Sequence, residues 1–334
     1  MEHERASPPN AERLGAVAST GQAATFDAAP VPASPTRRDA AWAKRLAFEA
    51  ELRSRKRLLS VFDPAASSFA HGALSAALFL LGLRGRGRRE AWDIQVHRRE
   101  IELERLPGRF DGFRILHLSD LHLGAGRDFA QHVAACVQGL DADLVVVTGD
   151  FRFHKGGPIE PAMQAFARVR EAMDAPVYAI FGNHDDAAMR AALEAMNVRV
   201  LVNEADVLRR GDEEIFLVGV DDPHLFRTDD LGAALEGVPE DACRVLLAHS
   251  PEPYATAAEA DLDLVLCGHT HGGQIALPGG MPVIRNARCP RRIARGAWRE
   301  GRLQGYTSVG TGYSTIDVRV NCPPEVVIHT LRAV

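Results

Sequence analysis

The chain has 334 residues, of which 46% are hydrophobic and 25% are charged, and its formal net charge is −5. It is long enough to bury a full core, either as one large domain or as one domain with appendages. The negative charge gives no reason to expect nucleic acid as the main partner, and five scattered cysteines without a close pair argue against a disulfide framework or a cysteine zinc site.

The first 90 residues differ in composition from the rest. Residues 1–40 are expected to be a disordered tail, because prolines recur there among small and polar residues without an apolar period. Residues 41–90 are expected to form a basic, helical region that contains an uncharged segment, 64–83, followed by an arginine run that ends at Arg89. Residues 91–334 have the composition of an α/β domain.

The uncharged segment 64–83 has about the length that a membrane-spanning helix needs, but Pro64, His71 and Gly72 make its insertion marginal. Basic clusters on both sides suit a helix that lies on an anionic leaflet. We therefore expect a cytoplasmic protein associated with the inner face of the membrane. Two alternatives stay open: a buried core helix with a solvated linker, and an exported, membrane-anchored protein, since residues 54–59 loosely resemble a twin-arginine signal.

Seven short apolar runs with β-branched residues predict strands in the α/β domain. They are residues 113–118, 144–148, 177–181, 215–220, 245–248, 262–267 and 326–330. Apolar residues at helical spacing, from Phe129 to Leu140 and from Met163 to Met173, separate the early strands. This alternation predicts βαβ units followed by a more strand-rich C-terminal half.

Five of these strands end in residue types that bind metal ions. The residues are Asp120 and His122, Asp150, Asn183 with His184 and Asp185, His249, and His269 with His271. In open α/β sheets ligands gather beyond the carboxyl ends of strands, so these side chains are expected to converge. Two carboxylates, one amide oxygen and four imidazoles suit two adjacent divalent cations. Glycines precede Asp150, Asn183 and His269, and they permit sharp turns and close approach of the backbone.

This ordered set of motifs resembles that of the calcineurin-like metallophosphoesterases. The signature from His269 to Ile275, with the late segment 322–325, resembles the bacterial branch typified by the YkuE phosphohydrolases. The resemblance covers about residues 92–334. The residues alone support only an α/β fold, and the resemblance implies a four-layer α/β/β/α sandwich of two mixed sheets with the metals at one sheet edge.

The resemblance also implies a role for each residue of the motifs. One metal ion would be held by Asp120, His122 and His271, the other by Asn183, His249 and His269, with Asp150 bridging the two. His184 would protonate the leaving oxygen, and Asp185 would hold the His184 ring in the useful tautomer. The ligand types leave manganese, iron, zinc and magnesium open.

The predicted function is hydrolysis of a phosphodiester, phosphomonoester or diphosphate bond by a metal-bridging hydroxide. The same wider class includes enzymes that cleave UDP-2,3-diacylglucosamine, so a lipid- or nucleotide-linked diphosphate is one expected substrate. Arg291 and Arg292 lie in an arginine-rich segment, 285–302. They are expected either to contact a second phosphate or an anionic membrane surface, or to belong to a solvated loop.

The sequence argues against two other functional classes. A non-catalytic metal-binding scaffold would be expected to lose ligands or the acid histidine, whereas this chain keeps them all. A nuclease would fit the arginine run 84–89, but the net charge and the lack of interleaved aromatic residues argue against it. Outside the motifs, Asp221 is expected to form a turn, and His224 to have a surface or packing role.

Overall fold

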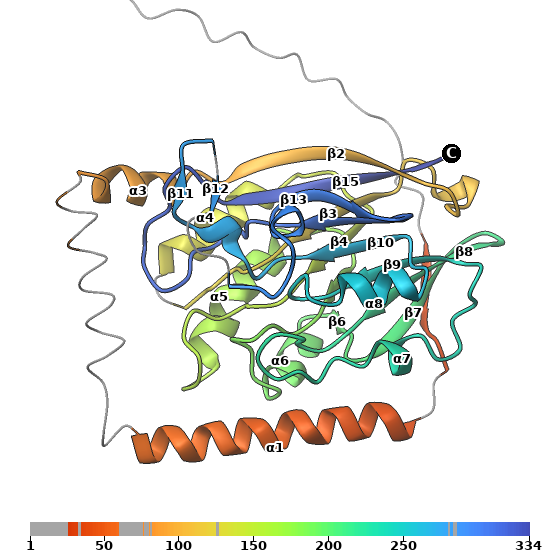
Figure 1. Ribbon diagram of the computed structural model, residues 1–334, viewed down its shortest axis with the longest axis horizontal. Coiled ribbons are helices and arrows are strands. Elements are labelled where there is room, and N and C mark those ends of the chain that lie inside the picture. The colour runs from red at the N-terminus through yellow and green to blue at the C-terminus, as the bar shows by residue number, and fades with distance from the viewer. Residues whose placement is uncertain are drawn as a thin grey trace, which may run out of the picture.

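The computed structural model describes residues 26–32, 35–59, 76, 80, 82–124, 127–279, 281–282 and 286–334. Two β-sheets face each other at the centre of the molecule, and helices cover their outer faces (Figure 1). Both sheets contain parallel and antiparallel pairs. The expected four-layer α/β/β/α sandwich is therefore confirmed.

The first sheet has six strands in the order β2-β15-β3-β4-β5-β6. They are β2 (Gln95–Leu103), β15 (Glu325–Ala333), β3 (Arg114–Leu118), β4 (Leu144–Val147), β5 (Val177–Ala179) and β6 (Val198–Val200). Strands β3 to β6 are parallel to one another, and the helices α4 (Arg127–Val137), α5 (Glu160–Glu171) and α6 (Met189–Ala195) connect them. These are the βαβ units that the sequence predicts.

The second sheet has seven strands in the order β1-β7-β8-β9-β10-β14-β13. They are β1 (Asp27–Pro30), β7 (Glu204–Arg210), β8 (Glu213–Gly219), β9 (Cys243–Leu247), β10 (Leu264–Cys267), β14 (Leu303–Thr307) and β13 (Gly296–Glu300). The short helices α7 (Leu231–Ala234) and α8 (Tyr254–Glu259) pack on its outer face, where Val218 and Ala257 belong to one apolar cluster. All seven predicted strands exist, with ends displaced by a few residues at most.

The remaining elements lie outside the two sheets. They are α1 (Pro35–Leu59), α3 (Arg84–Glu90), the 3-10 turns η1 (Gly108–Phe110), η2 (His271–Gly273) and η3 (Arg291–Ile293), and a ribbon of β11 (Ala276–Leu277) and β12 (Met281–Pro282). Figure 1 shows α1 along one side of the molecule, next to α6 and α7.

The central core lies between the two sheets. Ile115 and Val146 of the first sheet and Val245 and Leu266 of the second belong to one buried apolar cluster. The parallel strands are buried on both faces, which explains why their sequences are continuous apolar runs rather than alternating patterns. The polar residues that follow such strands therefore mark the sheet edge.

The N-terminal region differs from its prediction. Strand β1 pairs antiparallel with β7, and α1 begins at Pro35, so regular structure starts within the expected tail 1–40. The apolar segment 64–83 lies outside the described residues except for four positions, and residues 1–25 lie outside them entirely. Among the described helices, none combines the length and the hydropathy needed to cross a membrane.

Candidate metal centre

The carboxyl ends of five strands bring the predicted metal ligands together. Strands β3, β4 and β5 belong to one sheet, and β9 and β10 belong to the other. Three groups of side chains have ligand atoms within 4.8 Å of one another: Asp120, His122 and His271; His122, Asp150 and His184; and Asp150, His249 and His269. Asp150 and His122 each belong to two of these groups, and Asp150 links the side chains of the first sheet to His249 and His269 of the second. The bridging role of Asp150 stays a prediction.

The backbone around the cluster is strained. Asp120, His122, Asp150, His269 and His271 all have positive φ angles, between 45° and 70°. Such left-handed conformations cost about 1–3 kcal/mol each for residues other than glycine, and they persist at functional sites where the surroundings enforce them. The concentration of strain at these five residues fits a site built for binding rather than for stability.

Two glycines permit the close approach of the loops. A Cβ atom on Gly182 would collide with the side chain of Asp150, and one on Gly268 would collide with Ser119 and Asp120. The sequence prediction that these glycines allow close approach is confirmed by this packing.

Three imidazoles are oriented by backbone carbonyls on their outer side. His122 Nδ1 donates to Arg152 O at 3.1 Å, His249 Nδ1 to Thr148 O at 2.8 Å, and His269 Nε2 to Asn286 O at 2.6 Å. A carbonyl oxygen only accepts, so these ring nitrogens carry the hydrogen. Once such a ring is neutral, its other nitrogen presents a lone pair to the cluster, as a metal ligand requires.

Several acceptor atoms face one another inside the cluster. His249 Nε2 lies 3.0 Å from Asn183 Oδ1 and 3.1 Å from His269 Nδ1, and the buried Asp120 Oδ1 has no hydrogen-bond donor. Burial alone would lower the pKa of His249, but the carboxylates of Asp150 and Asp120 raise it to about 10. The cluster thus attracts positive charge, and divalent cations fit the donor set better than protons because they satisfy several lone pairs at once.

His271 is held differently from the other three imidazoles. Its Nε2 lies 3.0 Å from His122 Nε2, and Arg319 Nη2 lies 3.2 Å from its Nδ1. The Arg319 side chain is fully buried and donates to the carbonyl oxygens of Val309 and Gly310. Arg319 therefore ties the strand-end loop of His271 to the segment that precedes β15. No sequence motif pointed to this residue.

His184 lies at the rim of the cluster, with Nε2 3.9 Å from Asp150 Oδ2. Its Nδ1 donates to Phe153 O at 2.9 Å, so this carbonyl, rather than Asp185, fixes the tautomer. The carboxylate of Asp185 instead accepts from the backbone N–H groups of Asp150, Phe151 and Gly182, at 2.7 to 2.9 Å. The predicted contact of Asp185 with the His184 ring is therefore wrong. Asp185 instead joins the two loops that carry Asp150 and Asn183.

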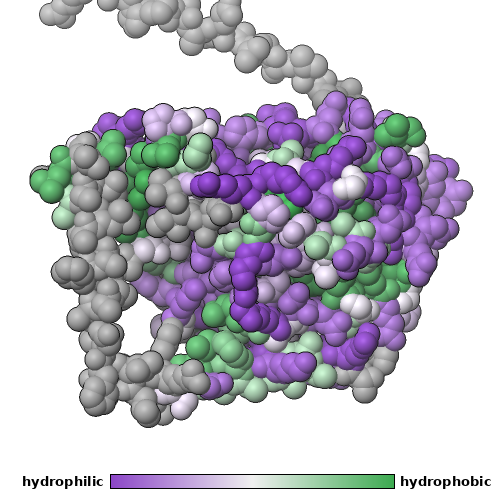
Figure 2. Space-filling model, in the orientation of Figure 1, coloured by the Kyte–Doolittle hydropathy of each residue, from purple (hydrophilic) through white to green (hydrophobic). Residues whose placement is uncertain are grey.

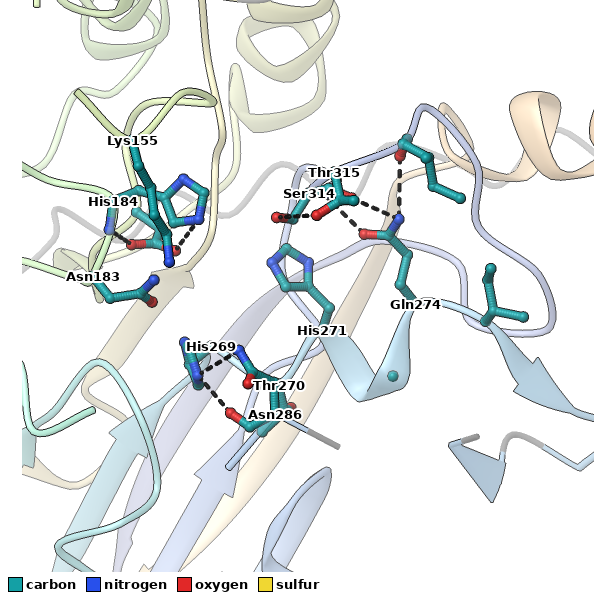
Figure 3. Close-up of a pocket in the computed structure, with 14 residues that line it drawn as sticks. Lys155, Asn183, His184, His269, Thr270, His271, Gln274, Asn286, Ser314 and Thr315 are labelled. Carbon is teal, nitrogen blue, oxygen red and sulfur yellow. Dashed lines mark hydrogen bonds and ion pairs between the residues drawn. The ribbon is translucent and has the colours of Figure 1, made fainter. Parts of the chain in front are cut away.

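A cavity of about 480 Å³ opens over the cluster. In Figure 3, Lys155 and His184 stand on one side of it and Ser314 and Thr315 on the other. Gln274 Nε2 donates to Ser314 O at 2.9 Å and Gln274 Oε1 accepts from Ser314 N at 2.8 Å, which fixes this second wall. The cavity is large enough for a phosphoryl group with organic substituents.

Arg291 and Arg292 do not line this cavity. Both are exposed on η3, and Arg292 forms an ion pair with Glu300 at 2.5 Å. Their predicted contact with a second phosphate or a membrane surface stays a prediction.

The helix α1 supports the cluster through a charged residue that sequence reasoning missed. Arg45 has no exposed surface; it forms an ion pair with Asp221 and donates to Glu49 at 3.0 Å and to the carbonyl of Asp185 at 2.8 Å. Glu49 in turn accepts from Ala187 N at 2.9 Å. These contacts hold the loop 182–187, which carries three of the predicted site residues: Asn183, His184 and Asp185. Asp221 is therefore more than a turn residue.

His224 also lies closer to the cluster than expected. Its ring centroid is 4.0 Å from that of His269, and its Nδ1 lies 2.7 Å from Glu252 Oε1. Since Glu252 is distant in sequence, no spacing rule in the chain could reveal this pair.

A buried cluster of imidazoles and carboxylates at the shared edge of two sheets defines a class of metal-dependent hydrolases, and sequence comparison gives the family. Residues 113–273 match the calcineurin-like phosphoesterase family. The phosphodiesterase YaeI of Escherichia coli is 30% identical over 66% of this chain and 82% of its own length. The metallophosphoesterase YkuE of Bacillus subtilis is 28% identical over 72% of this chain and 86% of its own.

A transmembrane protein with a metallophosphoesterase domain from Danio rerio is 30% identical over 70% of this chain. The chain spans 56% of the length of that relative. The chain belongs to the calcineurin-like phosphoesterase family. The matched segment 113–273 contains all seven predicted ligands but neither α1 nor Arg319.

Proposed function

We propose that the protein hydrolyses a phosphate ester or diphosphate bond with two divalent metal ions. The observation that carries this proposal is the convergence of carboxylate oxygens and imidazole nitrogens around Asp150, where the buried Asp120 Oδ1 has no hydrogen-bond donor. When bound, the two ions would activate a water molecule as the nucleophile and neutralise charge on the phosphoryl oxygens. Manganese, iron, zinc and magnesium all suit oxygen and imidazole ligands.

The residues of the chain have distinct parts in this proposal. Asp120, His122 and His271 would hold one ion, Asn183, His249 and His269 the other, and Asp150 both. His184, when both of its ring nitrogens are protonated, would donate the Nε2 proton to the leaving oxygen, while its Nδ1 hydrogen stays bonded to Phe153 O. Asp185 would act through the backbone, by fixing the loops of Asp150 and Asn183.

The test is hydrolysis of bis-p-nitrophenyl phosphate by the full-length protein with added Mn²⁺, compared with Asp150→Asn. We expect the substitution to abolish turnover while the fold, followed by circular dichroism, is kept. A folded Asp150→Asn variant with wild-type turnover would contradict the proposal.

We also propose that the substrate is presented at an anionic membrane surface on the cytoplasmic side, where a lipid- or nucleotide-linked diphosphate such as UDP-2,3-diacylglucosamine would be found. Leu277 and Met281 of the β11–β12 ribbon are exposed, and Figure 2 shows hydrophobic surface at that end of an otherwise largely hydrophilic face. The arginine-rich α3 is tied to this ribbon, because Arg86 donates to Asn321, which donates to Ala276 O. Apolar tips beside cations favour anionic bilayers.

Sedimentation with phosphatidylglycerol and with phosphatidylcholine vesicles tests the membrane part. We expect binding to the anionic vesicles only, and weaker binding after Leu277→Ser with Met281→Ser. Equal recovery of the protein in the supernatant with both vesicle types would contradict it.

A further inference from the structure

A second cavity, of about 200 Å³, adjoins the metal cavity. It is a groove between α1 and the loops that follow β4, β5 and β8, and its apolar lining comes from Leu52, Leu225 and Phe226. We call it the α1 groove. Leu52 and the rest of α1 lie outside the matched segment 113–273, so the family match does not cover the α1 side of the groove, whereas Leu225 and Phe226 lie inside it.

The two cavities share Lys155, Asn183 and His184. Figure 3 shows these three residues together on one wall of the metal cavity. A substrate whose phosphorus lies over the cluster therefore extends into the α1 groove past His184. Since His184 is the proposed proton donor to the leaving oxygen, the group that enters the groove is the one bonded to that oxygen.

The charged side chains of the groove already have partners. Arg53 donates to Glu49 at 2.9 Å and to Asp186 at 3.3 Å. Arg152 donates to the carbonyl oxygens of His184 and Gly157 and lies 3.8 Å from the Asp186 carboxylate. The lining thus combines apolar surface with the paired charges of Arg53 and Arg152. Such a lining does not compensate a second phosphate, but it favours an uncharged apolar group.

We propose that the α1 groove binds an apolar alcohol moiety of the leaving group, so that the substrate is a phosphate ester of an apolar alcohol. This inference rests on the proposed hydrolase function and narrows its substrate class. In the reaction water adds to phosphorus, the bond from phosphorus to the leaving oxygen breaks, and that oxygen takes the proton of His184. The groove has room for roughly six methylene groups, if each needs about the 30 Å³ of a water molecule.

The test uses substrates in which an alkyl group is bonded directly to the leaving atom. O-methyl S-hexyl phosphorothiolate and its S-ethyl analogue release a thiol when the phosphorus–sulfur bond breaks, so thiol release identifies the leaving group. We expect kcat/KM of the full-length, Mn²⁺-loaded protein to be about tenfold or more higher for the S-hexyl ester, because four additional methylene groups leave water. An S-(5-carboxypentyl) ester, equally long but charged, is expected to lose that advantage.

Variants on two different elements locate the effect. Leu52→Asp on α1 and Leu225→Asp after β8 are each expected to bring the ratio of kcat/KM for the S-hexyl and S-ethyl esters to about one. The matched control is Leu46→Asp, because Leu46 lies on the same helix, is 44% exposed and does not line the groove. This control is expected to keep the wild-type ratio.

The outcomes separate the two proposals. Hydrolysis of both esters with equal kcat/KM, or an equal loss of the ratio in Leu46→Asp, would overturn the groove assignment and leave the hydrolase intact. Absence of turnover with every ester, including bis-p-nitrophenyl phosphate, would overturn the proposed function and the groove with it.

Discussion

The metal cluster and α1 lie on two sides of the loop 182–187, but the sequence encodes them in different ways. The residues of the cluster lie in five short motifs, each of which directly follows a strand, and all five motifs lie within the segment that matches the family. The support from α1 depends on Arg45 and Glu49, which lie outside that segment and pair with residues more than 130 positions away. The metal ligands can therefore be recognised from short sequence motifs, whereas the contacts that hold their loop in place join residues far apart in the sequence.

Substitutions in the cluster and in α1 are therefore expected to affect different properties of the protein. Loss of a cluster residue is expected to remove catalysis and leave the fold, since the backbone of the cluster is already strained and Asp120 Oδ1 is buried without a donor. Loss of the α1 contacts is expected to act first on stability. Four substitutions test this division.

The largest expected effect is that of Asp120→Asn. Asp120 Oδ1 is buried without a donor, so an amide removes the negative charge at the position where a cation would be bound. We expect kcat/KM for bis-p-nitrophenyl phosphate to fall by about a thousandfold, since a catalytic metal ion contributes several kcal/mol to transition-state stabilisation. Asp212→Asn, at an exposed turn between β7 and β8, is the control; if the two variants are equally active, Asp120 is not a ligand.

The next largest effect is expected for Arg45→Met. This change leaves the carboxylate of Asp221 buried without its cation and leaves Glu49 with only the exposed Arg53, and loss of a buried partner typically costs about 3–5 kcal/mol. Urea unfolding measures the free energy of unfolding. The exposed neighbour Lys44, changed to Met, is expected to alter it by less than about 0.5 kcal/mol. Equal stability of the two variants would mean that α1 does not dock as described.

His184→Gln is expected to lower turnover by about a hundredfold for alkyl leaving groups, which need a proton. The loss should be much smaller for p-nitrophenol, which leaves as a stable anion. Parallel kcat measurements with O-methyl O-hexyl phosphate, followed by the release of hexanol, and with bis-p-nitrophenyl phosphate give the two losses. A common loss for both leaving groups would assign His184 to positioning instead of proton transfer.

The smallest effect is expected for Arg53→Ala, which sharpens the comparison within α1 itself. Arg53 also pairs with Glu49, but it is 62% exposed, so solvent screens the ion pair and its loss should cost less than about 1 kcal/mol. Urea unfolding beside Arg45→Met checks this. If Arg53→Ala lowers the free energy of unfolding as much as Arg45→Met does, the burial of Arg45 does not explain its contribution to stability.

The strands and the ligand set could be predicted because both are periodic or local in sequence. Val145 to Val147 and Leu264 to Leu266 are apolar throughout, and the polar residues just beyond such runs can only lie at the sheet edge. The same reasoning gave the glycines at 182 and 268, because a loop that turns into a crowded site leaves no space for a Cβ atom.

The sequence could not reveal contacts between residues distant along the chain. Arg45 is one of several basic residues in a helix of low hydropathy, and nothing local marks it as the buried one. Strand β1 is too short and too rich in alanine and proline to stand out, and it forms because β7 offers it an edge. Likewise the Asp185 carboxylate accepts hydrogen bonds from three backbone N–H groups. These groups come from two different loops, after β4 and after β5, so the sequence around Asp185 alone could not predict the contacts.

The most direct test of the account is metal analysis of the full-length protein together with its turnover of bis-p-nitrophenyl phosphate. Metal-depleted protein would be titrated with Mn²⁺, and the bound ions per chain compared for the wild type and Asp150→Asn. The account predicts that activity appears as two ions bind, and that Asp150→Asn, which alters the residue shared by two ligand groups, loses both bound metal and activity. Full turnover in the metal-depleted protein would contradict it.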